Sequence, residues 1–105
     1  MKSSQALWTK QQLEELVHVL AKDSSRVIFT EHCLQRMGQR GVSTIEVLRC
    51  LQRGSIVRGP SYSAEHKSFE FRMSEPAPRN VVCIVAAVEP VVAPGQLFAI
   101  TVWEV

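Results

Sequence analysis

The stretch that most constrains the fold is Val81–Val88, VVCIVAAV, because every residue in it is apolar. A strand that is apolar on both faces must be covered on both sides, as the interior strand of a sheet is. The run has the length of a strand and is far too short to cross a bilayer. We therefore predict that Val81–Val88 is the central strand of a sheet.

Three further strands are predicted around this one. Phe69–Met73 alternates apolar and polar residues, which is typical of a strand with one buried and one solvated face. Ser55–Arg58 reads as a strand interrupted by Gly59–Pro60, and Leu97–Trp103 as the last strand. The loops between these segments are short, and short loops join antiparallel neighbours. The sheet is therefore expected to be a three- to four-stranded antiparallel meander, with these aromatic residues packed in the core: Phe69, Phe71, Phe98 and Trp103.

Helices are predicted ahead of the sheet. Thr9 and Gln12 have the spacing of a capping box, and apolar residues then repeat at helical intervals to about Lys22. A second helix begins after Thr30, and a third begins at a second capping box, Ser43 to Glu46, and ends before Gly54. Arg26–Phe29 is a short extended segment between the first two. The predicted class is α+β, with two to three N-terminal helices on one face of the meander.

At 105 residues the chain suits one hydrophobic core, so a single domain over residues 1–105 is predicted. Residues 1–8 are expected to be a loose N-terminus, residues 9–54 the helical part, and residues 55–105 the antiparallel sheet. The beginning of the chain lacks the apolar segment of a signal peptide. We therefore expect a soluble, cytoplasmic protein that does not bind membranes.

The three cysteines, Cys33, Cys50 and Cys83, are odd in number and far apart. This spacing is unlike a disulfide framework or a zinc ribbon, and it suits a reducing compartment. We expect free, mostly buried thiols. No metal site and no cofactor are predicted.

The net charge of +2 does not by itself indicate a nucleic-acid-binding protein. Its distribution is uneven, because residues 22–60 hold seven basic and three acidic residues, whereas residues 61–105 hold three basic and five acidic ones. Such asymmetry is typical of a surface that faces an anion. The solvated face of an amphipathic helix explains Arg49 and Arg53 equally well.

A stripe of cationic side chains is predicted on the second helix. His32, Arg36 and Arg40 follow one another at intervals of four residues, which places them on one helical face. Leu34 and Met37 point elsewhere, toward whatever the helix packs on. We therefore expect the stripe to lie at a surface or in a cleft.

The run His32-x-x-x-Arg36-Met37-x-x-Arg40-Gly41, followed by a capped helix ending in Arg-Gly, resembles a bacterial family of small domains of unknown function. That family is usually grouped with the RelE/ParE-like toxins, in the wider group of barnase, EndoU, colicin and RelE ribonuclease folds. The resemblance extends from about Phe29 to the C-terminus as an order of elements. It implies a RelE/ParE-like fold and, less directly, a metal-independent endoribonuclease that acts as the toxin of a toxin–antitoxin or polymorphic toxin system.

Ribonucleases of this kind let the 2′-hydroxyl attack the adjacent phosphate, which requires a base, an acid and cations. Histidine is the natural acid or base at neutral pH, so His32 is the candidate for that role. Arg36, Arg40 and Arg72 are the candidate catalytic cations, since guanidinium groups hold phosphate oxygens with two donors. Tyr62 and Arg58 are assigned to substrate binding. Glu70 is the one carboxylate that strand alternation places near Arg72, and His66 is left without a role.

The expected partners are RNA or the ribosome, together with a cognate antitoxin or immunity protein. Another interpretation remains open, because an i, i+4 stripe of cations is also explained as a structural helix face that pairs with carboxylates or carbonyls. In that case the protein is a catalytically silent module of the same fold that binds protein or nucleic acid. The near-neutral charge favours the silent module, and the stripe favours the enzyme.

Overall fold

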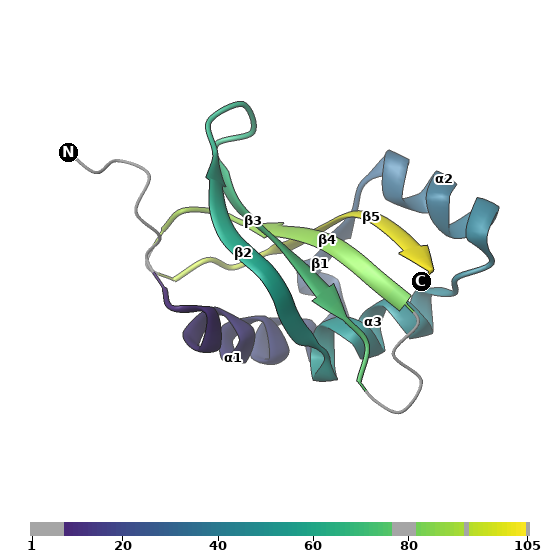
Figure 1. Cartoon of the computed structure of the whole chain (residues 1–105), viewed down its shortest axis with the longest axis horizontal. Helices are drawn as coiled ribbons and strands as arrows, with labels where there is room; N and C mark the ends of the chain where they lie inside the picture. Colours follow the sequence, from purple (N-terminus) through teal and green to yellow (C-terminus); the bar gives the residue numbers. More distant parts are fainter. Residues whose placement is uncertain (1–7, 77–81, 92, 105) are drawn as a thin grey trace.

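The computed structural model describes residues 8–76, 82–91 and 93–104. Across these residues the chain forms three α-helices, a short 3-10 helix and a five-stranded sheet (Figure 1). The predicted α+β class is therefore confirmed. The predicted loose N-terminus, except Trp8, lies outside the described residues, as does most of the connection between the predicted strands Phe69–Met73 and Val81–Val88. The elements are α1 Lys10–Ala21, the 3-10 helix Ser24–Arg26, β1 Val27–Phe29, α2 Glu31–Arg40, α3 Thr44–Arg53, β2 Ser55–Ser63, β3 Ser68–Ser74, β4 Val82–Val88 and β5 Leu97–Glu104.

The helices begin where the capping residues predicted. Thr9 Oγ1 accepts from the Gln12 N–H at 3.1 Å, and the Gln12 side chain accepts in return from the Thr9 N–H at 3.0 Å. Ser43 and Glu46 form the same reciprocal pair. These bonds satisfy backbone donors that have no partner inside the helix. Both predicted capping boxes are confirmed.

The strand order is β1-β5-β4-β3-β2, and β4 lies inside the sheet between β5 and β3. Both neighbours are antiparallel to it. Its residues are apolar on both faces because both faces are shielded from solvent: Ile84 and Ala86 point to the core, and Ala87 on the opposite side is only 2% exposed. The prediction of an interior strand is confirmed for residues 82–88, and Val81 lies outside the described residues.

β1 is part of the sheet and runs parallel to β5 at its edge, with Val27 paired to Leu97. The sequence predicted only a short extended segment here. A parallel partner needs a long connection, which α2, α3 and the other strands supply. The sheet is therefore mixed, with an antiparallel meander of four strands and one parallel edge strand.

The helices differ in the part of the sheet that they cover. α1 packs on β2 and α3, while α3 packs on β3 and β4, and both lie on one side of the sheet (Figure 1). α2 packs instead against β5, at the other end of the sheet. One hydrophobic core joins these layers, with Leu13, Leu51 and Phe71 among its largest buried side chains. None of the helices in the described part of the chain is long and apolar enough to span a bilayer.

The face of the sheet opposite α1 and α3 is called the open face below. Its residues alternate with the core residues, and they include Arg72 of β3, Val85 of β4 and Thr101 of β5, which are register partners in one row. Phe98 and Trp103 also lie on this face and are only half-buried. The prediction that these two aromatic residues pack in the core is therefore wrong, because the register aims them away from α1 and α3.

Candidate functional site

Two arginines face each other across neighbouring strands of the open face. Arg58 of β2 is the register partner of Arg72 of β3, whereas the preceding pair, Ile56 with Met73, points into the core. From one pair to the next, β2 advances by two positions and β3 by only one, which defines a β-bulge. A bulge re-aims a side chain. Without it, Arg58 would point into the core beside Ile56.

β2 also continues through Gly59–Pro60 to Ser63, so the predicted interruption of the strand at this point is wrong. A second register shift between Arg58 and Ser61 accommodates the two residues. Gly59 has φ of +92°, and a Cβ there would lie 2.9 Å from the Glu70 carbonyl oxygen. Glycine therefore allows β2 to stay close to β3 while Arg58 and Ser61 both reach the open face.

The Arg72 guanidinium lies over the Trp103 ring, 5.6 Å from its centroid. This contact orients the planar cation. Among the described residues, neither Arg58 nor Arg72 forms an ion pair with a carboxylate. Like charges placed directly opposite on a sheet repel each other. A bound anion between the two guanidinium groups would remove this repulsion.

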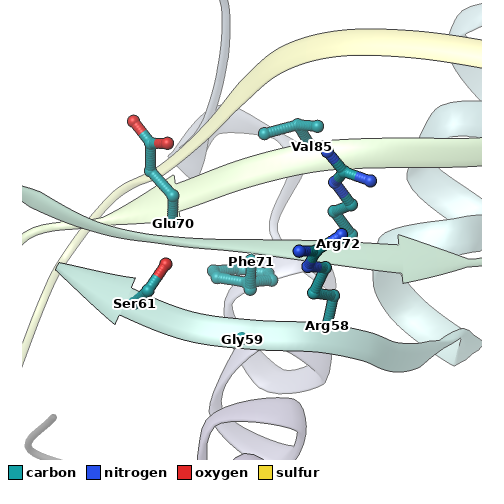
Figure 2. A pocket seen from close by; sticks show the side chains of 7 residues that line it. All are labelled: Arg58, Gly59, Ser61, Glu70, Phe71, Arg72 and Val85. Atoms are coloured by element: carbon teal, nitrogen blue, oxygen red, sulfur yellow. The ribbon is translucent and has the colours of Figure 1, made fainter. Parts of the chain in front are cut away.

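The two arginines line a cavity of about 250 Å³, called the arginine cavity (Figure 2). Figure 2 shows the two guanidinium groups at one end of the cavity and Ser61 and Glu70 at the other. Ser61 and Glu70 are register partners one row along from the arginines. The cavity therefore offers cations and a carboxylate from the same two strands. Its lining residues are Arg58, Gly59, Ser61, Glu70, Phe71, Arg72 and Val85.

Glu70, which lines the arginine cavity, also contacts a histidine of the turn between β2 and β3. The Nδ1 atom of His66 lies 3.0 Å from Glu70 Oε2, and a carboxylate only accepts hydrogen bonds, so Nδ1 is the donor. The backbone N–H of His66 donates to Ser63 Oγ at 3.2 Å, which fixes the turn between β2 and β3. When the ring carries a single proton, on Nδ1, Nε2 is the nitrogen that can accept another. Glu70 and His66 therefore have the arrangement of an oriented general base.

His66 also lines a second cavity of about 500 Å³ on the open face, called the Phe98 cavity. Its apolar residues are Ala87, Phe98 and Ile100, and its polar rim comes from α2, the β2–β3 turn and the end of β4. Glu70, Ala87 and Phe98 are successive register partners on β3, β4 and β5, so the two cavities are neighbours. The rim residues are Thr30, His32, His66, Lys67, Ser68 and Glu89.

Comparison with protein families identifies the family of this chain. The profile of the domain of unknown function DUF4258 matches residues 29–104. The chain belongs to this family. Comparison with curated proteins and with solved structures gives no significant match. Every residue that lines either cavity lies within the matched range, whereas α1 lies outside it, so both cavities belong to the DUF4258 domain itself.

The DUF4258 domain brings some of the predicted site residues together and separates others. Arg58 and Arg72 line the arginine cavity, while His32 is exposed and lines the Phe98 cavity. Arg36 and Arg40 share the expected four-residue spacing on α2, but they line neither of these two cavities. Tyr62 packs edge-to-face on buried Phe69, with ring centroids 5.4 Å apart. Tyr62 therefore lies with the core side of β2 and away from the two arginines.

The contact between His66 and Glu70 was not predicted. The predicted strand ended at Arg58, whereas β2 runs to Ser63 and a turn returns the chain to β3. The spacing of four residues between His66 and Glu70 was the available signal. That spacing brings side chains together in a tight hairpin as well as on a helix. Glu70 itself was correctly placed on the same face of β3 as Arg72.

All three cysteines of the domain are buried free thiols. Burial raises the pKa of the Cys33 thiol to about 11, and burial together with nearby Cys83 and Glu75 raises that of Cys50 to about 12. The thiolate is the reactive form of cysteine. These two side chains are therefore unsuited to act as nucleophiles at neutral pH. The described residues contain no group of three or more His, Cys, Asp or Glu side chains arranged to hold a metal.

We expect the three thiols of the folded protein to react slowly with a thiol-specific reagent at about pH 8. The physical reason is twofold: the reagent is excluded, and the raised pKa of Cys33 and Cys50 keeps both side chains protonated. Absorbance of the released chromophore, followed with and without denaturant, measures this. Unfolded protein should react rapidly at all three positions. Rapid labelling of the native protein at Cys33 or Cys50 would contradict the expectation.

Proposed function

We propose that this DUF4258 domain is a RelE-like, metal-independent endoribonuclease whose site is the open face of the sheet. The observation that supports this most is the pair Arg58 and Arg72, which line one cavity with Glu70, the carboxylate that contacts His66. Cleavage by the 2′-hydroxyl requires cations at the phosphate, a base and an acid. The two neighbouring cavities supply residues of each kind.

In the proposed reaction Arg58 and Arg72 hold the non-bridging oxygens of the scissile phosphate. Their planar donors match two phosphate oxygens, and charge on these oxygens grows as the 2′-oxygen attacks. The Nε2 atom of His66 takes the proton from the 2′-hydroxyl. Glu70 stabilises the imidazolium that results, because it accepts the Nδ1 hydrogen bond. The products are a 2′,3′-cyclic phosphate and a 5′-hydroxyl.

His32 is the second candidate for proton transfer, on the basis of the sequence resemblance. It lines the Phe98 cavity from the α2 side, opposite the turn that carries His66. In this arrangement His32 supplies the proton for the 5′-oxygen that leaves. Arg36 and Arg40 lie farther along α2 and are proposed to contact more distant phosphates of the RNA.

The resemblance to RelE/ParE-like toxins extends the proposal to a biological role. The domain would be the toxin of a toxin–antitoxin or polymorphic toxin system, with RNA or the ribosome as its target. A cognate antitoxin or immunity protein would inhibit it by covering the open face. Induced expression in bacterial cells measures this role, since an active toxin arrests growth and an inactive variant does not.

A catalytically silent binding module remains the second candidate. Its support is that His66 makes no described contact with Arg58 or Arg72, and that the net charge of the chain is only +2. In this case the two arginines bind an anionic group of a protein or nucleic acid without chemistry. The arginine pair is used in both functions, whereas the His66–Glu70 pair is required only by the enzyme.

The test is incubation of the purified protein with labelled RNA of mixed sequence in excess EDTA, with and without ribosomes. The expected result is cleavage that survives EDTA and leaves a cyclic phosphate. Replacing His66 by alanine should reduce the rate by about 10²-fold, the usual scale for losing a general base. The His32→Ala variant tests the second histidine in the same assay.

Circular dichroism must show that both variants are folded. If wild-type protein leaves RNA intact with and without ribosomes but still binds it, the silent module is the correct function. If His66→Ala retains full activity while His32→Ala loses it, the reaction stands but the base is assigned wrongly.

A further inference from the structure

We propose that the Phe98 cavity binds the base of the nucleotide next to the cleaved phosphate. This inference rests on the proposed function, because it takes the phosphate to lie between Arg58 and Arg72. Neither the resemblance to RelE/ParE-like toxins nor the cationic stripe on α2 indicated a subsite for a base.

The first support is the chemistry of the cavity. Its apolar residues Ala87, Phe98 and Ile100 lie on adjacent strands, and its volume of about 500 Å³ is in the range of small-ligand sites. Phe98 is half-buried and lines this cavity, so its ring is the aromatic group that a flat heteroaromatic ligand would contact there. Sequence-tolerant binding of single-stranded nucleic acid depends on such stacking.

The second support is the rim, which carries groups of both signs. Lys67 and the carboxylate of Glu89 are both exposed, and they line the cavity from different elements. Ser68 adds a hydroxyl. The edges of nucleobases present both donors and acceptors, so a rim with both can hold a base. A purely apolar ligand would form no hydrogen bond with these rim groups.

The third support is continuity with the arginine cavity. Glu70, Ala87 and Phe98 form one cross-strand row, in which neighbouring strands are separated by roughly 4.8 Å. The arginine pair occupies the next row on the same face, about 7 Å along the strands. The hydrogen bond between His66 and Glu70 joins the two cavities at their common border. One nucleotide can therefore reach both.

The test uses binding alone, so it does not depend on catalysis. A short fluorescent 2′-O-methyl RNA, which has no free 2′-hydroxyl and cannot be cleaved by this route, is compared with versions that carry one abasic residue at each position. We expect one abasic position to weaken binding by about 10-fold, as loss of a base–aromatic stack does. Fluorescence anisotropy gives the dissociation constants.

Phe98→Leu keeps an apolar side chain but removes the aromatic face. This variant should bind the intact RNA about as weakly as wild-type protein binds the abasic RNA. The abasic penalty, which is the ratio of the dissociation constants of abasic and intact RNA, should then fall to about one. Phe98→Tyr should restore the penalty. Ile45→Ala is the matched control, because Ile45 is 69% exposed on α3 and lines neither cavity. It should leave both constants unchanged.

Glu89→Lys is the second variant, chosen because an exposed residue can be replaced without loss of folding. It exchanges an acceptor for a donor at the rim, so the order of affinities among the four bases should change. An abasic penalty that persists in Phe98→Leu, or that is equal at all positions, would overturn the subsite. So would a failure of wild-type protein to bind the RNA. Base-dependent binding without cleavage of natural RNA would support the subsite and count against the endoribonuclease.

Discussion

Arg72→Ala is expected to lower the rate of RNA cleavage by about 10²- to 10³-fold, the usual cost of removing one preorganised donor to a developing negative charge. The guanidinium of Arg72 is held over Trp103 and faces Arg58, so it is fixed before the phosphate arrives. Arg72→Lys should recover little activity. An ammonium group cannot donate two parallel hydrogen bonds to a phosphate or stack flat on an indole.

The same replacement should leave stability within about 0.5 kcal/mol of wild type. Two opposing effects on the free energy of unfolding explain this. Loss of the repulsion between Arg72 and Arg58 stabilises the fold, and loss of the contact with Trp103 destabilises it. The matched control is Arg49→Ala on α3, which also removes one exposed charge but lies outside the arginine cavity. Equal losses of activity in Arg72→Ala and Arg49→Ala would mean that only overall charge matters, and the arginine cavity would lose its assigned role.

Gly54→Ala is expected to destabilise the fold by at least about 3 kcal/mol, at the upper end of the costs of overpacking. A Cβ at this position would overlap the backbone carbonyl oxygens of both Ser74 and Cys50. Neither is the end of a flexible side chain, so relief requires the end of α3 to move away from β3 and the last turn of α3 to distort. The shift would also disturb the hydrogen bond from His18 Nε2 to the Gly54 carbonyl, which is 2.7 Å long and ties α1 to the end of α3.

Gly38→Ala provides the matched comparison. Gly38 lies within α2, and a Cβ added there would meet no atom within 4 Å. Alanine in an exposed helix interior should therefore stabilise the protein by about 0.5–1 kcal/mol. Chemical denaturation of the two variants measures both effects. A Gly54→Ala variant as stable as wild type would show that α3 does not pack as closely on β3 as described.

Much of the fold could be predicted because its signals are local. The capping pairs Thr9 with Gln12 and Ser43 with Glu46 lie three residues apart, and the two-sided apolarity of β4 is visible in seven consecutive residues. β1 could not be placed in the same way. Its three residues pair in parallel with a distant strand, and no pattern of so short a segment identifies a partner.

The candidate site was predicted only in part, and the reason is the register of β2. Alternation from Ile56 would put Arg58 in the core, and only the bulge brings it beside Arg72. Gly59–Pro60 indicates an irregular strand, but no residue type in the sequence indicates the register shift between Ile56 and Arg58. His66 was missed because a turn, and not a helix, brings it to Glu70. His32 and Arg72 were predicted to serve one catalytic site, but they line different cavities. The sequence does not show how far α2 lies from β3.

The last strand, β5, is also the one that joins the edge strand β1 to the rest of the sheet. β5 pairs with β4 on one side and with β1 on the other, and Thr30, at the start of α2, donates to a β5 carbonyl 70 positions away. Closing so long a loop is entropically costly, so we expect such contacts to form late in folding. The β2–β3 hairpin, in contrast, needs only its own short turn. We therefore expect the arginine pair to assemble before the wall of the Phe98 cavity that β5 and His32 form.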